Sequence, residues 1–258
     1  MNQQSRFPTC VQPIFQNDDV YTYKLRDNLY LFHTVEGVPV SVYLIEGEES
    51  ALVIDTGHVI KNLTEAIRKV TQKPLILALS HGHHDHIGSI NEFDMNKGDE
   101  SMIHDYHGKI NFIQPGYIFH LGNLDVTVLE MYGHTPGSIG FLDTKNKYIV
   151  SGDAVGHKVV WMHISKLPLE SLLGVLRHLL SIKGQWNEIY TGHYNQSNGP
   201  LGHQYIQDLL NLTQKICHTQ GYKAEPFNFG PPVDFQPMIA YGDNGVGVVF
   251  NPARLHYL

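Results

Sequence analysis

The sequence predicts an α/β fold with two β-sheets and helices on their outer sides. Blocks of β-branched and aromatic runs alternate twice with segments of helical periodicity along the 258 residues. No linker or low-complexity segment separates the two halves, and the length lies within the range of large one-domain α/β proteins. We therefore expect a single domain over residues 1–258, with a C-terminal helix and a β-hairpin as an extension.

The N-terminal half predicts four strands before the first helix. Short runs of β-branched and aromatic residues are separated by polar or glycine-containing breaks, as is typical of strands. In the segment 61–71, apolar residues recur at Leu63, Ile67 and Val70, the spacing of an amphipathic helix. The expected strands cover residues 20–25, 28–34, 38–46 and 50–56, and a fifth, at 75–80, follows the helix.

The C-terminal half predicts two long helices and several strands. The helices cover residues 167–181, where Pro168 fits the first turn, and 200–219. The segment 118–131 alternates well enough for one or two strands, and residues 139–143 and 148–151 are expected to pair as a hairpin. A short strand is expected at 188–191. The runs 238–241 and 246–250 flank Asp243-Asn244-Gly245, a hairpin turn signature.

Composition narrows the class of partner. The 18 Lys and Arg against 25 Asp and Glu give a net charge of −7, which argues against nucleic acid as a partner. Cys10 and Cys217 do not suggest a disulfide framework, although a single bridge between them stays open. The N-terminus lacks the features of a signal peptide, and no run approaches the roughly 18 apolar residues of a membrane span. We expect a cytoplasmic protein that acts on a small-molecule substrate and has no membrane partner; its oligomeric state is left open.

The densest group of metal-ligand side chains is the segment 80–88, which reads S-H-G-H-H-D-H-I-G. It follows an apolar run, 74–80, that is expected to form a buried strand. If that strand ends near Ser80, His81 and His83 lie two residues apart on extended chain and point to the same side. Asp85 and His86 follow on the turn into the next helix and face a second point. Such a density of ligands suits two metal ions a few Å apart, and a solvated histidine-rich loop is the alternative.

Three further candidate ligands follow predicted strands downstream. His134 lies in the turn G-H-T-P-G, Asp153 follows the strand 147–150, and His193 follows the strand 188–190. Strand ends at one edge of a sheet are where α/β folds hold their chemistry. One histidine after a strand is more often a structural residue. The agreement of several such positions therefore predicts a shared site.

Together these motifs resemble the metallo-β-lactamase superfamily over the chain from about Ser41 to His193, a span that includes the V-I-D-T-G block at 53–57. The resemblance implies a four-layer αβ/βα sandwich with a dinuclear metal site at its edge. It also implies how the ligands divide between the two ions. One ion would be held by His81, His83 and His134, the other by Asp85, His86 and His193, and Asp153 would bridge them.

The expected function is that of a dinuclear metal-dependent hydrolase, whose metal-bridging hydroxide attacks a small ester, lactone, thioester or phosphodiester. Imidazole and carboxylate ligands suit zinc, our first choice, and also iron or manganese. Asp85 is expected to be both a ligand and the catalytic proton acceptor. Asp55 is expected to orient a ligand imidazole, with a turn-capping role as the open alternative. The alternative function is a sulfur dioxygenase-like oxidoreductase with a single iron.

Two departures from branches of the family narrow the substrate. Asp153 stands where the commonest zinc β-lactamases have a cysteine, so β-lactam hydrolysis is not expected as the main role. Glyoxalase II-like enzymes carry a basic C-terminal region that binds glutathione. Residues 199–258 of this chain contain only Lys215, Lys223 and Arg254 as basic residues, which disfavours glutathione thioesters.

Several aromatic and histidine residues are candidates for substrate contact. His157, Trp161 and His163 lie in the segment 155–165, which leaves the bridging aspartate and is expected to line a pocket. Tyr194 follows a predicted ligand and is a candidate donor to a substrate oxygen. Plain core packing is the alternative for each of them.

Two other histidines are expected outside the ligand set. His58 belongs to a triplet T-G-H that repeats the one at 191–193, but it is expected to begin a helix and has no position in the motif. His84 occupies the variable position of its motif.

Overall fold

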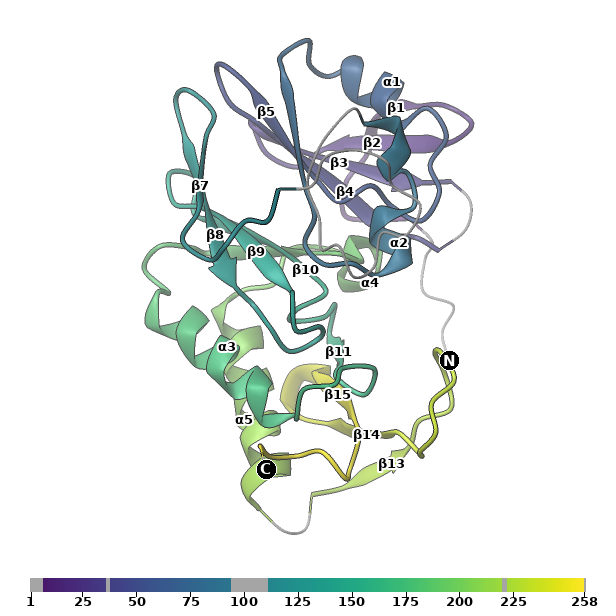
Figure 1. Cartoon of the computed structure of the whole chain (residues 1–258), viewed down its shortest axis with the longest axis vertical. Coiled ribbons are helices and arrows are strands. Elements are labelled where there is room, and N and C mark those ends of the chain that lie inside the picture. Colours follow the sequence, from purple (N-terminus) through teal and green to yellow (C-terminus); the bar gives the residue numbers. More distant parts are fainter. Residues whose placement is uncertain (1–6, 36–37, 94–110, 220–221, 258) are drawn as a thin grey trace.

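The computed structural model describes residues 7–35, 38–93, 111–219 and 222–257 (Figure 1). Two large sheets share a hydrophobic core, and helices cover their outer faces, which confirms the predicted α/β class. The sequence predicted two sheets, and this was wrong in one respect. A third sheet of four strands lies at the C-terminal side of the described chain (Figure 1).

The first sheet has six strands, arranged in chain order from β1 to β6. Every neighbouring pair is antiparallel except β5 and β6, which are parallel because α1 (Leu63–Arg68) crosses between them. Leu63, Ala66 and Ile67 of α1 pack on the outer face of this sheet. The strands are β1 (Pro13–Gln16), β2 (Val20–Lys24), β3 (Leu29–Thr34), β4 (Ser41–Glu46), β5 (Ala51–Ile54) and β6 (Leu75–Ala78).

The second sheet has five strands in the order β12-β10-β9-β8-β7. The predicted hairpin of β9 and β10 is present, and β12 pairs with β10 in parallel. The inner faces of the first and second sheets meet in one core, to which Tyr43 and Phe141 contribute from opposite sides. The strands are β7 (Ile118–His120), β8 (Asp125–Glu130), β9 (Ile139–Asp143), β10 (Tyr148–Gly152) and β12 (Glu188–Thr191).

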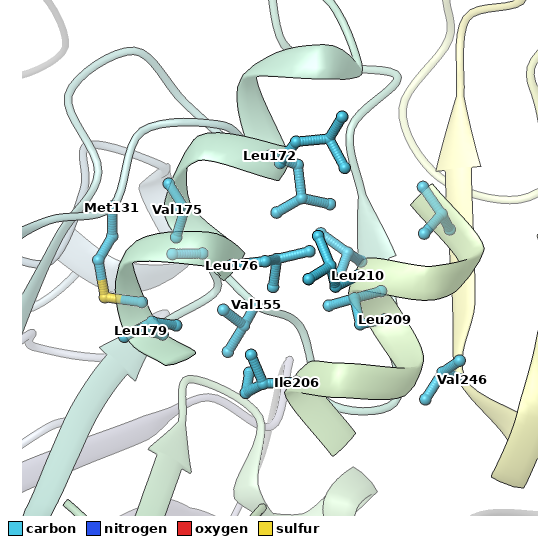
Figure 2. Packing of buried hydrophobic residues seen from close by; sticks show 14 of the residues in the cluster. Met131, Val155, Leu172, Val175, Leu176, Leu179, Ile206, Leu209, Leu210 and Val246 are labelled. Carbon is cyan, nitrogen blue, oxygen red and sulfur yellow. The ribbon is translucent and has the colours of Figure 1, made fainter. Parts of the chain in front are cut away.

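Two long helices, α3 (Glu170–Ser181) and α5 (His203–His218), cover the outer face of the second sheet. In Figure 2, Leu176 of α3 lies next to Leu209 and Leu210 of α5. Val175 and Leu179 of the same helix lie beside Met131, and Leu172 belongs to the same buried cluster. This spacing of three and four residues is what aligns apolar side chains on one face of a helix. The order helix, sheet, sheet, helix is the predicted four-layer αβ/βα sandwich.

The third sheet combines β11, which follows β10 in the chain, with strands from the C-terminal part of the chain. Its order is β11-β15-β14-β13, and β14 and β15 form the predicted hairpin around the 3-10 turn η3 (Asp243–Gly245). The segment 155–165, expected as a loop, contains β11, because its partner β15 is distant in sequence and leaves no local signal. The strands are β11 (Val159–Trp161), β13 (Ala224–Pro226), β14 (Met238–Tyr241) and β15 (Gly247–Phe250).

Two observations bear on the expectations about cysteines and membranes. Cys10 is exposed and Cys217 is buried, and both are free thiols, so no bridge joins them. Within the described ranges, none of the helices combines the length and apolar character that crossing a membrane requires.

Candidate metal centre

The seven predicted ligands come together where β6, β8, β10 and β12 lead into loops. The ligands of the first motif lie after β6, and the motif runs into the short helix α2 (His84–Ile87), which begins after the extended residue His83. Another lies in the turn after β8, and the last two follow the parallel strands β10 and β12, the latter just before α4 (Tyr194–Ser197). The residues are His81, His83, Asp85, His86, His134, Asp153 and His193.

His81, His83 and His134 form a first group of three nitrogens. The Nδ1 atom of His83 lies 3.1 Å from Nε2 of His81 and 3.0 Å from Nε2 of His134. His134 lies 51 residues after His83, so the fold rather than local sequence brings it to the other two histidines. The group is the same as the first predicted ligand set.

Asp85, His86 and His193 form a second group, in which one ligand atom from each lies within 4.8 Å of the others. His193 Nε2 is 3.8 Å from Asp85 Oδ2. His86 is fully buried, whereas the side chain of Asp85 is 19% exposed and therefore reachable by a small molecule. This group matches the second predicted ligand set.

The carboxylate of Asp153 lies between the two groups. Its Oδ2 is 3.3 Å from His193 Nε2 and 3.8 Å from His134 Nε2. Its Oδ1 is 3.5 Å from His86 Nε2, and neither of these two buried atoms has a hydrogen-bond partner. One carboxylate thus faces histidines of both groups.

Asp55 lies behind the cluster and holds it in place. It follows β5 in a left-handed conformation, with a φ of 63°. Its Oδ1 accepts a hydrogen bond from the Ser80 backbone N–H at 2.7 Å. Its Oδ2 lies 2.7 Å from both Ser80 Oγ and His86 Nδ1. A single buried carboxylate therefore fixes the end of β6 and the ring of one candidate ligand.

The outer nitrogens of three imidazoles donate to protein oxygens. His86 Nδ1 donates to Asp55, His134 Nδ1 donates to the Trp161 carbonyl at 2.8 Å, and His193 Nδ1 donates to the Pro39 carbonyl at 3.0 Å. A neutral imidazole carries one proton, so in that form its Nε2 presents a lone pair to the centre.

In the first group of histidines, the number of available protons shows whether these lone pairs suit a cation. Ser80 Oγ donates to Asp55, so it accepts from His81 Nδ1 at 3.0 Å, and His81 Nε2 is left with a lone pair. His81 Nε2 and His134 Nε2 then both face His83 Nδ1, which can donate to only one of them. Converging lone pairs without enough protons fit a bound cation, and neutral imidazole is the form that binds metals.

The pKa values follow the same division. Burial lowers the pKa of His81 well below its ordinary value, lowers that of His83 to about 4, and lowers that of His134. Burial also acts to lower the pKa of His86, but the charges of Asp153 and Asp55 outweigh it and raise this pKa. The three histidines of the first group are therefore neutral near pH 7. In the second group, the carboxylates of Asp153 and Asp55 favour a positive charge on His86.

At two positions of the motifs, steric crowding requires glycine. A Cβ atom at Gly192 would lie 2.2 Å from Asp153 Oδ1 and 2.7 Å from the ring of His86. A Cβ atom at Gly152, where φ is 51°, would lie 2.3 Å from Ser80 Oγ. Side chains at either position would displace the cluster, which explains why glycine precedes both Asp153 and His193.

The predicted substrate-contact residues have different surroundings. The ring of His157 lies 5.2 Å from that of His193, and the Trp161 carbonyl binds His134. His163 is buried and packs on Trp161 at 5.5 Å. Tyr194 instead lies in the core between the large sheets.

The contacts of Tyr194 lead away from the cluster. Its ring stacks on Tyr190, and its hydroxyl is 3.6 Å from Cys10 Sγ. His58 does not begin a helix, since α1 starts five residues later; its ring lies 5.6 Å from that of the exposed His84.

Sequence reasoning missed the backbone carbonyls that orient the histidines and the two rings of Phe227 and Phe229, which approach Trp161. No local pattern marks a carbonyl as a ligand partner. The phenylalanines follow β13, whose pairing with β14 is not visible as a periodic run.

A cavity of about 340 Å³ also borders His81. Apolar and polar side chains share its wall, including Leu79, Phe112, Glu130 and Tyr132. It provides room beside the first group of histidines.

Comparison with known proteins agrees with this geometry. A family model of the metallo-β-lactamase superfamily matches residues 35–110. The human acyl-coenzyme A thioesterase MBLAC2 is 25% identical over 228 residues, covering 69% of this chain and 81% of the relative. The family model, the curated relatives and the solved structures all indicate the metallo-β-lactamase superfamily.

Two further proteins are also similar to this chain. Hydroxyacylglutathione hydrolase GloC of Haemophilus influenzae is 25% identical over 151 residues, covering 47% of this chain and 71% of the relative. A solved metallo-β-lactamase from Pontibacter korlensis has a TM-score of 0.58 at 15% identity, covering 74% of this chain and 97% of that one, and supports the fold alone. The named relatives are hydrolases, and together with the family model and the clustered His and Asp side chains they support a metal-dependent hydrolase.

Proposed function

We propose that this hydrolase holds two divalent metal ions and cleaves a thioester or a related small ester. The observation that carries the proposal is the position of Asp153. Its two carboxylate oxygens lie 3.3 to 3.8 Å from histidines of both groups, as a bridging ligand requires. A site for a single ion would have no use for the second group of ligands.

The ligands of one ion would be His81, His83 and His134, those of the other Asp85, His86 and His193, with Asp153 shared. Two bound divalent ions, with zinc as our first choice over iron or manganese, supply Lewis acidity toward a carbonyl oxygen and lower the pKa of a nearby water molecule.

The protein's own groups would transfer the proton and hold the ligand imidazoles in position. The side chain of Asp85 is 19% exposed, somewhat more than that of Asp153 at 14%, so Asp85 is placed to accept a proton from the attacking water and pass it to the leaving group. Asp55 and the two carbonyls that bind His134 and His193 would keep the imidazoles in position during turnover.

A thioester is the first substrate class to test. The relatives with named activities act on acyl-coenzyme A and hydroxyacylglutathione. The scarcity of Lys and Arg in residues 199–258 makes glutathione the weaker of these two candidates. The oxygen-dependent alternative with a single iron is not favoured, because seven ligand side chains converge where fewer would suffice. A small-molecule substrate, a cytoplasmic location and the absence of nucleic acid partners remain predictions.

The deciding experiment is elemental analysis of the full chain, purified without added metal or chelator, followed by a panel of thioesters, esters and lactones. We expect two divalent ions per chain and hydrolysis of at least one thioester. Asp153→Asn should lower the metal content and abolish turnover, whereas Asp125→Asn, an exposed aspartate paired with His120, should leave both unchanged. One iron per chain with substrate-dependent oxygen consumption would overturn the proposal.

A further inference from the structure

Three aromatic rings form a corner beside the metal centre. Trp161 of β11 meets Phe227 and Phe229, with ring centroids 5.6 and 5.8 Å apart and interplanar angles of 71° and 78°. Phe227 and Phe229 are themselves 6.4 Å apart at 82°. We call Trp161, His163, Phe227 and Phe229 the aromatic corner. Because the rings of Trp161, Phe227 and Phe229 meet edge to face and are not stacked in parallel, each pair covers less of the ring faces than a stack would, which leaves apolar surface for a further ring.

The corner is open to solvent on one side. Phe229 is 73% exposed, although Phe227 and Trp161 are only partly so. The turn that carries the phenylalanines is held close to the tryptophan: a Cβ atom at Gly230, where φ is 102°, would lie 3.1 Å from Trp161. A single exposed phenylalanine is ordinary, but one seated against a tryptophan at the edge of a catalytic cluster provides an apolar surface for a ligand.

His163 adds an uncharged polar group under the rings. It is 3% exposed, and its ring lies 5.5 Å from Trp161 and 5.7 Å from Phe227. Neither of its ring nitrogens has a hydrogen-bond partner. Burial lowers its pKa to about 4, so the imidazole is neutral. The corner therefore carries no charge, and it favours an uncharged group over a phosphate or carboxylate.

Main-chain contact joins the corner to the metal centre. The carbonyl of Trp161 accepts the hydrogen bond from His134 Nδ1 at 2.8 Å, so the residue that presents the aromatic ring also holds a proposed metal ligand. Trp161 is thus one hydrogen bond away from a proposed metal ligand, and from this contact we infer that a substrate bound at the metal centre can place a neighbouring group against the corner.

We propose that the aromatic corner binds an uncharged aromatic ring of the substrate and so selects aryl-bearing thioesters or esters over those with short alkyl groups. The selection rests on the proposed function, but binding of the ring itself does not require hydrolysis. Phe229 is then a specificity-determining residue, and His163 positions the rings of Trp161 and Phe227.

A binding measurement tests the ring site without turnover. The chain has two tryptophans, and Trp186 is fully buried, so emission changes report mainly on Trp161. The probes are the non-hydrolysable thioethers S-benzyl- and S-methyl-N-acetylcysteamine, titrated into the full chain. We expect the benzyl compound to change the emission and to bind more tightly than the methyl compound. Phe229→Ala should weaken benzyl binding about 3- to 10-fold, the range of one lost ring pair.

Tyr241→Ala is the matched control, because Tyr241 is an exposed ring of the same sheet, 57% accessible, and lies at the other end of β14 from the phenylalanines. It should bind both probes like the parent. Equal binding of both probes by the parent, or an equal effect of Phe229→Ala on both, would overturn the aromatic corner. So would a dimer that is lost in Phe229→Ala, since the corner would then belong to a second copy of the chain.

Turnover of S-benzoyl- and S-acetyl-N-acetylcysteamine separates this inference from the proposed function. A preference for benzoyl that falls about 3- to 10-fold in Phe229→Ala supports both. Hydrolysis of both substrates without preference retains the hydrolase and removes the corner. Selective benzyl binding without hydrolysis of any panel member retains the corner as a ring site and removes the proposed reaction.

Discussion

His86 Nδ1 donates a hydrogen bond to Asp55 Oδ2 at 2.7 Å, and the exposed fractions of the two residues are 0% and 1%. The same carboxylate receives the backbone N–H and the hydroxyl of Ser80. All of its hydrogen-bonding partners are therefore donors that fix the metal centre from behind. Replacing such a partner of a ligand histidine typically weakens metal binding 10- to 100-fold.

We therefore predict that Asp55→Asn lowers metal affinity by about 10- to 100-fold. The new amide N–H₂ group would face a donor of Ser80 or His86, and one hydrogen bond that orients the site would be lost. The measurement is competition with a chromophoric chelator on the full chain. Asp125→Asn, an exposed carboxylate on the second sheet, is the control. Unchanged affinity in Asp55→Asn would show that the ring of His86 is held by other contacts.

Gly192→Ala should cost about 100-fold in kcat/KM, because a Cβ atom 2.2 Å from Asp153 Oδ1 must displace the carboxylate by a large part of an ångström. The matched variant is Gly184→Ala, where a Cβ atom would meet nothing within 4 Å. Steady-state kinetics on the best substrate of the panel gives the comparison. Equal activity of the two variants would contradict the steric reason given for the glycine before His193.

Leu176→Ala should lower the free energy of unfolding by about 2–5 kcal/mol, since Leu176 is fully buried between α3 and α5 (Figure 2). Urea denaturation followed by circular dichroism measures the change. Leu180→Ala, on the same helix but only partly buried, should cost less. If the two variants lose the same stability, the contact between the helices is not what holds this layer.

The two thiols should differ in reactivity at pH 8. Burial raises the pKa of Cys217 to about 11, so only about one molecule in a thousand carries its thiolate at that pH. Cys10 is exposed. Iodoacetamide should label one thiol per native chain and two in denaturant, as counted by intact mass. Labelling of both in the native state would contradict the buried position of Cys217.

The regular parts of the fold were predictable from periodicity. The apolar run 75–80 contains β6, and the spacing of Leu172, Val175, Leu176 and Leu179 places α3 on the core. Helix α1 is shorter than the predicted 61–71, because Asn62 takes a left-handed conformation before it and the chain turns after Arg68. The extent of a single domain over 1–258 stays a prediction.

The ligand motifs were visible because metal chemistry restricts their residue types, and the structure places the side chains of both predicted sets together. Strands β1, β11 and β13 were not predicted, since three or four residues carry no period and their pairing is decided by partners elsewhere in the chain. The aromatic corner depends on two such strands. The ring of Phe229 could therefore not be placed near Trp161 from sequence.

The backbone and the side chain of Trp161 make different contacts. Its carbonyl holds His134, while its indole meets Phe227 and Phe229. Every amino acid has that carbonyl, so exchanging the side chain at position 161 leaves the hydrogen bond to the histidine available. Reactivity and substrate choice are thus separable by mutation at one position. A library of side chains at 161 would retune which molecules this scaffold accepts while its chemical machinery stays in place.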